Sequence, residues 1–360
     1  MSFAVIAITR NGARLGKKLA QGLAGAQLYV STRYAGQAGS GARHFEPAAL
    51  RDLVSELWGK LDGLVFIMAT GIVVRMIAPH LKSKDSDPAV AVMDDAGKFA
   101  ISLLSGHLGG ANELAERCAF ITGARPVITT ATDANELPSF DMLAKEQGWL
   151  IEDLSRVKLL NSLLLDGEEI AIVDPSGMTR SWFRGRGRLS CHAGFADALA
   201  SKAKGLLFVT NHYFPPKSVP DNLLILRPRN LVLGIGCNRG TPAEEIDEFV
   251  GKHLRRIFLS IKSVAMIASA EAKSDEPGLI AYAGQYGIPL KFYSSEQLNG
   301  VTVPTRPSAY VMAAIGAGGV AEPAAVLASG GGRLLLHKVK SANVTLAVAE
   351  IEESRDEDPC

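Results

Sequence analysis

A glycine-rich run around one histidine is the first place where this sequence could carry chemistry. The run Ser105-Gly106-His107-Leu108-Gly109-Gly110-Ala111-Asn112 follows an apolar segment typical of a strand and begins a helical pattern. Glycine is unfavourable inside a helix, so three of them here indicate that something packs closely against this backbone. The dipole of a helix N-terminus favours a neutral imidazole, which can accept a proton or polarise an oxygen. The alternative is structural: Ser105 caps the helix and the glycines admit a neighbouring element.

A second glycine-rich loop, in the last third of the chain, offers a place for an anion. Leu231–Ile235 predicts a buried strand and Gly236–Gly240 a loop, after which Thr241-Pro242-Ala243-Glu244 begins a helix with a capping box. Free N–H groups at a helix start favour an anion, and Arg239 adds a planar donor suited to carboxylate or phosphate. The glycine spacing departs from the dinucleotide fingerprint, and no acidic residue follows at the expected distance. A nicotinamide cofactor is therefore not expected, and a structural turn is the alternative.

Three further loops follow segments that predict strands of the first sheet. They are Thr70-Gly71-Ile72-Val73-Val74-Arg75, Asp94-Asp95-Ala96-Gly97 and Thr129–Asp133. Ligands of open α/β sheets bind outside the carboxyl ends of the strands, so these loops are candidates for a binding site. Asp94 and Asp95 also fit the turn of a hairpin, and each of them can be a turn residue only.

Several common catalytic patterns are absent from the sequence. It contains no G-x-S-x-G elbow, no H-E-x-x-H pair and no phosphate-binding loop. The four cysteines form no C-x-x-C pair, and the seven histidines have no metal-ligand spacing. Serine-nucleophile hydrolysis, a built-in metal ion and the use of ATP are therefore not expected.

Alternating strand and helix patterns must position these residues. They predict an α/β protein of several domains: an N-terminal open, mostly parallel α/β sheet over residues 1–150, a small α/β middle domain over 151–229, and a separate C-terminal α/β domain over 230–350. Residues 351–360 predict an acidic tail. The alternative for the middle region is that it shares one sheet with the first domain.

Composition excludes several classes of protein. The chain has 360 residues, of which 47% are hydrophobic and 21% charged, as in a packed globular enzyme. Its net charge of +1 gives no whole-chain attraction to nucleic acid or to an anionic membrane. The N-terminus has no basic region before its apolar stretch, and the uncharged tract Gly63–Val74 is too short to span a bilayer. We therefore expect a cytoplasmic protein with no membrane or nucleic-acid partner.

Taken together and in order, the motifs resemble the cobalt-precorrin-5A hydrolase family of anaerobic cobalamin biosynthesis. The loops at Thr70–Arg75, Val92–Gly97, Ser105–Asn112 and Thr129–Asp133 resemble the N-terminal domain of that family. Three runs resemble its C-terminal domain, namely Gly234–Glu245, Lys273–Gly278 and Val320–Ala325. The resemblance covers nearly the whole chain and is weakest in the middle domain. It departs at Cys237-Asn238-Arg239, where two basic residues are expected after the cysteine.

The resemblance implies a substrate and a reaction. The substrate is a cobalt-containing tetrapyrrole that carries a δ-lactone between a ring acetate and the C20 bridge. Water opens the lactone, and C20 leaves with its methyl group as acetaldehyde to give cobalt-precorrin-5B. The enzyme is thus a hydrolase acting on a carbon–carbon bond, with no cofactor of its own, because the substrate carries the cobalt. A homodimer and contacts with neighbouring enzymes of the pathway stay open.

The resemblance also suggests which residues do the work. Lactone opening needs an activated water, a group that holds the oxyanion and a proton donor. His107 is the candidate base, Asp94 or Asp95 would orient it or supply a proton, and the main-chain N–H groups of Gly109 and Gly110 would hold the oxyanion. The residues expected to bind the carboxylate-fringed substrate are Thr70, Gly71, Arg75, Ser105, Gly106, Gly109, Gly110, Asn112, Thr130, Asp133, Gly234, Gly236, Arg239, Gly240, Thr241, Lys273, Glu276 and Glu322.

Two rival hypotheses use the same features. A non-catalytic carrier of corrinoid biosynthetic intermediates would bind the tetrapyrrole in the same pockets and release no acetaldehyde. A nucleotide-dependent enzyme would rest on the Gly234–Gly240 loop alone.

Overall fold

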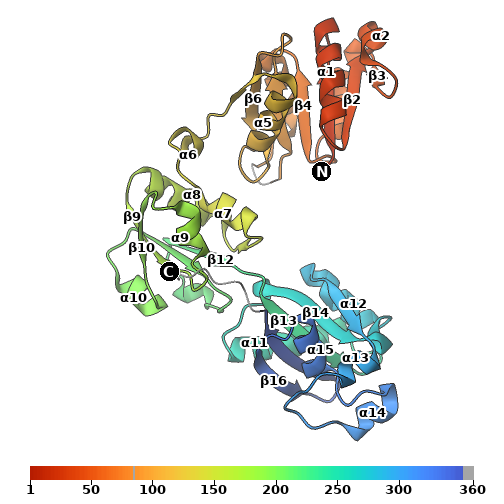
Figure 1. Cartoon of the computed structure of the whole chain (residues 1–360), viewed down its shortest axis with the longest axis vertical. Coiled ribbons are helices and arrows are strands. Elements are labelled where there is room, and N and C mark those ends of the chain that lie inside the picture. Colours follow the sequence, from red (N-terminus) through yellow and green to blue (C-terminus); the bar gives the residue numbers. More distant parts are fainter. Residues whose placement is uncertain (84–85, 352–360) are drawn as a thin grey trace. The chain divides into compact units, whose positions relative to one another are not determined.

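The computed structural model of the chain describes residues 1–83 and 86–351. The chain divides into two compact units between Met142 and Leu143, and each unit is described by itself (Figure 1). Strands and helices alternate in both units, and the strands form three sheets. The predicted fold class, α/β with an open and mostly parallel first sheet, is confirmed. The predicted acidic tail lies outside the described residues except for Ile351.

The first unit is built on a seven-stranded sheet in the order β3-β2-β1-β4-β5-β6-β7. All neighbours are parallel except β5 and β6, which form the hairpin that the Asp94–Gly97 turn predicts. The strands are β1 (Phe3–Ala7), β2 (Ala26–Ser31), β3 (Arg43–Phe45), β4 (Gly63–Ile67), β5 (Ala89–Met93), β6 (Phe99–Leu104) and β7 (Arg125–Val127). The helices are α1 (Arg10–Gly22), α2 (Ala35–Ala38), α3 (Leu50–Leu57), α4 (Thr70–Ile77), α5 (Ala111–Thr122), α6 (Ala131–Ala134) and α7 (Phe140–Glu146), the last of which crosses the division.

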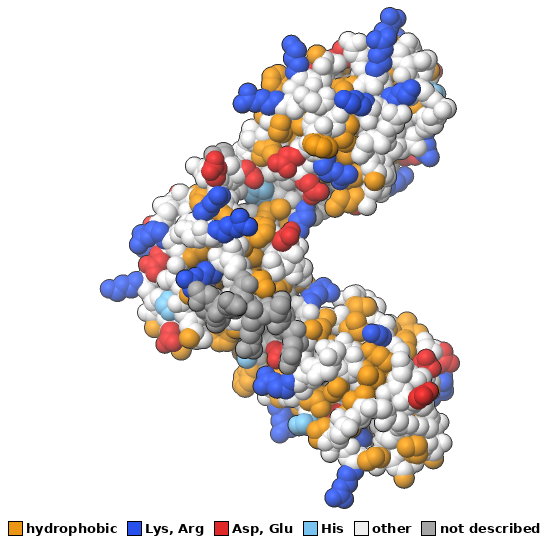
Figure 2. All heavy atoms as spheres, in the orientation of Figure 1, with side chains coloured by type: hydrophobic (Ala, Val, Ile, Leu, Met, Phe, Trp, Pro, Cys, Tyr) orange, Lys and Arg blue, Asp and Glu red, His pale blue; other side chains and the backbone are white. Residues whose placement is uncertain are grey.

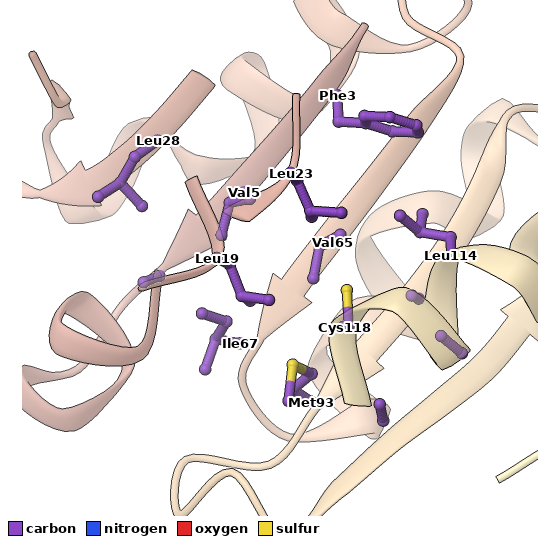
Figure 3. Close-up of a cluster of buried hydrophobic side chains, with 14 of the residues drawn as sticks. Phe3, Val5, Leu19, Leu23, Leu28, Val65, Ile67, Met93, Leu114 and Cys118 are labelled. Atoms are coloured by element: carbon purple, nitrogen blue, oxygen red, sulfur yellow. The ribbon is translucent and has the colours of Figure 1, made fainter. Parts of the chain in front are cut away.

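Apolar side chains cover both faces of this sheet. Every residue of β1, β4 and β5 is buried, as the continuous apolar runs of these strands predict for the centre of a parallel sheet. On one face, Leu19 of α1 and Leu114 and Cys118 of α5 pack over Val65 and neighbouring strand residues (Figure 3). On the other face, α3 and α4 contribute buried residues to a second cluster. The two layers fix the loops at both edges of the sheet.

The antiparallel β6 divides the predicted site loops between opposite edges of this sheet. Its last residue, Leu104, pairs with Val90 near the start of β5, while Ala100 pairs with Met93 at the end of β5. Since β7 is parallel to β6, the loops after β6 and β7 lie where β1, β4 and β5 begin. The loops after β4 and β5 lie at the other edge, about 17 Å away along β6. The expectation that the strand-end loops of this sheet share one edge is therefore wrong.

The second unit begins with a five-stranded sheet in the order β10-β9-β11-β12-β8. The first predicted boundary, 150/151, falls inside this unit, because β8 pairs with Leu226 and Arg227 of β12. Strands β9 to β12 are mutually parallel along the sheet. The elements are β8 (Leu150–Ile151), α8 (Leu154–Leu165), β9 (Glu169–Val173), α9 (Met178–Phe183), β10 (Arg188–Cys191), α10 (Phe195–Ala200), β11 (Gly205–Val209) and β12 (Leu223–Arg227).

The third sheet, in the order β15-β14-β13-β17-β16, also belongs to the second unit. Strands β13, β14 and β15 are parallel, and β17 and β16 follow antiparallel. The predicted boundary 229/230 falls in the short connection between β12 and β13. The elements are β13 (Leu231–Cys237), α11 (Ala243–Arg256), β14 (Val264–Ala270), α12 (Pro277–Tyr286), β15 (Leu290–Tyr293), α13 (Ser295–Asn299), α14 (Ala309–Ile315), α15 (Ala321–Ala328), β16 (Leu334–Lys340) and β17 (Val344–Glu350).

The surface carries charges of both signs. Lys and Arg side chains are spread over the visible face rather than gathered in a single patch (Figure 2). Among the described residues, no helix is both long and apolar enough to cross a membrane.

Candidate functional site

His107 lies between two carboxylates in the first unit. Its Nδ1 is 3.1 Å from Oδ2 of Asp141, the second residue of α7, and its Nε2 is 2.8 Å from Oδ2 of Asp133 in α6. The hydroxyl of Thr132 lies 3.1 Å from the same Nε2. The side chain of Asp141 is 3% exposed and that of Asp133 is 42% exposed. One ring nitrogen therefore faces a buried carboxylate and the other faces the open side of the site.

These neighbours change the proton affinity of the imidazole. The hydrogen bond to Asp141 raises the pKa of His107 above its ordinary 6.5, and Asp133 raises it further, while burial acts in the opposite direction. The expected helix N-terminus does not control the ring, because α5 begins only at Ala111. The prediction that the helix dipole keeps His107 neutral is therefore wrong.

Asp133 joins two of the predicted motifs. Its Oδ2 accepts hydrogen bonds from the hydroxyl of Thr130 at 2.5 Å and from Nδ2 of Asn112 at 3.0 Å. The Oδ1 of Asn112 in turn accepts a hydrogen bond from the hydroxyl of Ser102 at 2.7 Å. The structure thus brings together four residues that the sequence predicts as site residues, His107, Asn112, Thr130 and Asp133.

The glycines of this loop allow the chain to fold back on itself. Ser105 has a φ of 59°, and its hydroxyl donates a hydrogen bond to the carbonyl of Asp87 at 3.0 Å. A Cβ on Gly109 would lie 2.3 Å from the Cβ of Ser105, and one on Gly106 would lie 2.8 Å from Oδ1 of Asn112. The close packing that the glycines predict is therefore internal to the loop. It fixes the backbone that carries His107.

The main-chain N–H groups of this loop are partly used. The N–H of Gly110 donates a hydrogen bond to the carbonyl of His107 at 2.9 Å. The N–H of Gly110 closes the turn and is not available to hold an oxyanion. The expectation that Gly109 and Gly110 hold it together is therefore corrected for Gly110.

Asp94 and Asp95 make contacts away from the imidazole. Asp94 accepts hydrogen bonds from the N–H groups of Phe99 at 2.7 Å and of Ala96 at 3.1 Å, which closes the β5–β6 turn. Asp95 accepts a hydrogen bond from the N–H of Gly12 at 3.2 Å, in the first turn of α1. Because both residues directly follow Met93, the last residue of β5, they lie at the sheet edge opposite His107. The carboxylates that contact the ring are Asp133 and Asp141, which corrects the expectation that Asp94 or Asp95 orients it.

The loop after β4 also lies at this opposite edge. Thr70 begins α4, and Gly71 follows in its first turn, where an added Cβ would meet no atom within 4 Å. Arg75 is exposed in the last turn of the helix. These three predicted binding residues are accessible and are separated from the His107 cluster by the sheet.

The loops after β13 and β14 meet in the second unit. The N–H of Gly240 donates to Oε1 of Glu276 at 2.7 Å, and Nζ of Lys273 lies 3.5 Å from Oε2 of the same carboxylate. Arg239 pairs with Asp275 at 3.1 Å. Glu276 is fully buried. The two segments are thus neighbours in the structure, and their basic groups are paired with acidic ones.

Gly234, Gly236 and Thr241 have structural explanations. A Cβ on Gly234 would lie 1.8 Å from the carbonyl oxygen of Ala321, so the glycine admits α15 against β13. A Cβ on Gly236 would lie 2.6 Å from Oγ1 of Thr345. The predicted capping box is wrong: α11 begins at Ala243, and the hydroxyl of Thr241 donates to the carbonyl of Asn238.

Glu322 is a buried carboxylate held by main-chain donors. It is 1% exposed and accepts hydrogen bonds from the N–H groups of Lys338 at 2.9 Å and Thr305 at 3.2 Å. Burial would raise the pKa of Glu322, but these N–H groups hold it below its usual range. The contacts described for Glu322 tie three chain segments together.

Sequence reasoning missed Asp141 and Thr132. Both contact the ring of His107, and each is the second residue of a short helix. Thr132 lies within the predicted Thr129–Asp133 loop but is not among the predicted site residues. For Asp141 the only local signal is an acidic residue in a first helical turn, which is common in helices without a function. Only the tertiary structure reveals their place beside the imidazole.

Three models of protein families match the chain in order. The model described as cobalamin synthesis G N-terminal matches residues 52–133, the cobalamin biosynthesis central region matches 138–228, and the cobalamin synthesis G C-terminus matches 231–349. The three models together span most of the chain.

Two curated proteins named cobalt-precorrin-5A hydrolase are similar to the chain. The protein from Priestia megaterium is 37% identical over 356 residues, which cover 97% of this chain and 95% of that protein. The protein from Salmonella typhimurium is 35% identical over 79% of this chain and 81% of its own. A crystal structure of a cobalamin biosynthesis protein G homolog from Sulfolobus solfataricus covers 98% of this chain and 97% of its own, with 23% identity and a TM-score of 0.34.

Proposed function

The chain belongs to the cobalt-precorrin-5A hydrolase family of cobalamin synthesis G proteins, and on that premise we propose that it uses water to open the δ-lactone of cobalt-precorrin-5A and releases acetaldehyde. The product is cobalt-precorrin-5B, and the enzyme is a hydrolase acting on a carbon–carbon bond. The observation that carries the proposal is similarity along nearly the whole chain to a protein of that name.

The His107 cluster supplies the proton transfer in this proposal. The buried Asp141 accepts a hydrogen bond from Nδ1–H, which leaves Nε2 to take a proton from the attacking water. In the resting arrangement Nε2 faces Asp133 and Thr132, and the water would enter on this open side. The cation that forms on the ring is stabilised by both carboxylates. It can then return the proton to the oxygen that leaves the lactone.

The predicted cations Arg75, Arg239 and Lys273 are not assigned to the substrate in this proposal. Arg75 lies at the sheet edge opposite His107. Arg239 and Lys273 are paired within the protein with Asp275 and Glu276.

Replacing His107 tests the assignment of the base. We expect His107→Ala to lower the rate of acetaldehyde release from cobalt-precorrin-5A by ~10²–10⁴-fold under anaerobic conditions, since general base catalysis contributes that much. His44→Ala is the matched control, because it removes an exposed histidine of the same unit. Full activity of His107→Ala would remove His107 from the mechanism and leave the reaction itself untouched.

The proposal gives the protein no metal ion of its own. The cobalt ion is part of the substrate, and the described residues place no three His, Cys, Asp or Glu side chains so as to share a metal ion. Dialysis of the protein against a chelator is therefore expected to leave its melting temperature unchanged. A clear decrease would identify a structural metal site. The cytoplasmic location and the homodimer remain predictions of the sequence.

A further inference from the structure

A cavity of about 800 Å³ lies in the second unit, at the carboxyl ends of the parallel strands of the middle sheet. Its walls include Asp174–Ser176 after β9, Ala193–Phe195 after β10 and Thr210–His212 after β11. Arg333, which precedes β16, and Glu350, the last residue of β17, also line it. No residue that the sequence predicts as a site residue lines this cavity.

The cavity coincides with the point where the strand order reverses. In the sheet, β10 lies next to β9 on one side, and β11, which follows β10 in the chain, lies next to β9 on the other side. The loops after β9 and β11 therefore leave a crevice between them, and open α/β sheets bind their ligands at this point. The loops that line the cavity on both sides, Asp174–Ser176 and Thr210–His212, are these two loops.

The acidic groups of the wall are compensated within the protein. Asp174 is fully buried and accepts hydrogen bonds from the N–H and the hydroxyl of Ser176 at 3.0 and 2.6 Å. Glu350 accepts a hydrogen bond from Nδ2 of Asn211 at 3.0 Å and pairs with Arg333 at 3.3 Å. An anionic ligand would therefore meet hydroxyl and guanidinium donors beside one carboxylate that is paired with Arg333 and one that already accepts hydrogen bonds within the protein.

The ring of Phe195 forms an aromatic part of one wall. Phe195 lines the cavity, and its ring centroid lies 4.9 Å from that of Phe208, 5.1 Å from that of Phe214 and 5.7 Å from that of His212. Burial lowers the pKa of His212, and the nearby Arg227 lowers it further, so the ring is neutral and can donate one hydrogen bond. Flat ligands stack on such a wall.

A buried arginine holds the loop that carries His212. Arg227 is 1% exposed and donates hydrogen bonds to the carbonyls of Thr210, at 2.9 Å, and of His212. Glu152 pairs with the guanidinium at 2.6 Å. The wall is therefore fixed before a ligand arrives, which lowers the entropic cost of binding.

We propose that this cavity binds the tetrapyrrole: the macrocycle stacks on Phe195, and His212 and Arg333 donate to its peripheral carboxylates. The inference rests on the proposed function for the identity of the ligand. A volume of about 800 Å³ lies near the upper end of the roughly 300–1,000 Å³ of small-molecule sites, as a large ligand requires. It assigns affinity for the macrocycle to the second unit.

Filling the cavity tests the inference. Gly194 lines the cavity, has an extended backbone with φ −142°, and an added Cβ would meet only Oδ2 of Asp197, at 3.5 Å, so Gly194→Phe fits the backbone and adds a ring at the cavity wall. The probe is cobyrinic acid, a stable cobalt corrin with free carboxylates, titrated by calorimetry. We expect Gly194→Phe to weaken binding by at least about tenfold. Gly284→Phe, at a position of α12 with no atom within 4 Å, should bind as the wild type does.

Hydrogen exchange on the wild-type protein gives a second readout that needs no variant. Bound cobyrinic acid should protect residues 193–195 and 210–212 from exchange. Wild-type binding that leaves these segments unprotected, unweakened binding by Gly194→Phe, or no binding to the wild type would each overturn the cavity assignment. Acetaldehyde release by the wild type would then still support the proposed function. Binding in the cavity without acetaldehyde release would contradict the proposed function and would still support the cavity assignment.

Discussion

At the scale of residues, Asp141 determines which ring nitrogen of His107 faces the open side of the site. The carboxylate is buried, the ring nitrogen that it meets is Nδ1, and the other nitrogen faces the more exposed Asp133. A buried carboxylate that fixes an imidazole by Nδ1 prepares Nε2 for proton transfer. Both carboxylates raise the pKa of His107, so the ring is a stronger base than a free histidine.

This pairing predicts a pH dependence. The base must be neutral to accept a proton, so kcat/KM should fall as the pH drops through the pKa of His107, which lies above its ordinary 6.5. Asp141→Asn removes the largest raising interaction, so the fall should move to lower pH and the maximal rate should also decrease. Asp52→Asn, an exposed position on α3 of the same unit, is the control. A pH profile of Asp141→Asn that overlays the wild type would show that Asp141 does not act through His107.

The sequence predicts some of this cluster and misses the rest for a physical reason. His107 and Asn112 belong to one glycine-rich loop, and Thr130 and Asp133 to one strand-end loop, so local patterns reveal them. Asp141 comes later in the chain and reaches the ring only through the tertiary fold. Side-chain contacts between segments that are distant in sequence leave no local pattern.

At the scale of elements, the direction of one strand decides which residues can act together. The Asp94–Gly97 turn predicts the hairpin, and the hairpin makes β6 antiparallel to its neighbour. The loop that carries His107 consequently lies at the edge opposite Asp94 and Asp95. The rule that ligands bind at the carboxyl ends of strands holds for parallel strands, and β6 runs antiparallel to β5. The glycines of β13 are a similar case. The sequence predicts Gly234 as part of an anion-binding loop, whereas in the structure the absence of a side chain there lets α15 pack against β13.

Gly234→Ala tests the role of that glycine. A Cβ there would lie 1.8 Å from the carbonyl of Ala321, within backbone that cannot move without displacing α15. Overpacking of this kind typically costs ~1–3 kcal/mol, so the midpoint of urea unfolding should decrease. Gly284→Ala, in open space on α12, should leave the midpoint unchanged or raise it, because alanine favours a helix. Unchanged unfolding of Gly234→Ala would mean that the glycine serves a ligand.

At the scale of the whole molecule, the boundaries between the three sheets differ in how far the sequence predicts them. The predicted start of the last domain lies in the connection between β12 and β13, where a strand, loop and helix pattern begins in the sequence, whereas the division near Met142 follows from no such pattern. It depends on β8, a two-residue strand that joins the second unit by pairing with β12. Such a short strand carries too few residues for a periodic pattern. The cavity in the second unit is likewise formed by loops whose residues show no common motif.

The central claim, catalytic opening of the lactone, is tested most directly by counting turnovers. The purified wild-type protein is incubated anaerobically with an excess of cobalt-precorrin-5A, and the trapped acetaldehyde is quantified against the amount of protein. The account predicts many equivalents of acetaldehyde per chain and the same amount of cobalt-precorrin-5B, with none above background when protein is omitted. Tight binding of the tetrapyrrole without acetaldehyde release would contradict the account and identify the protein as a carrier.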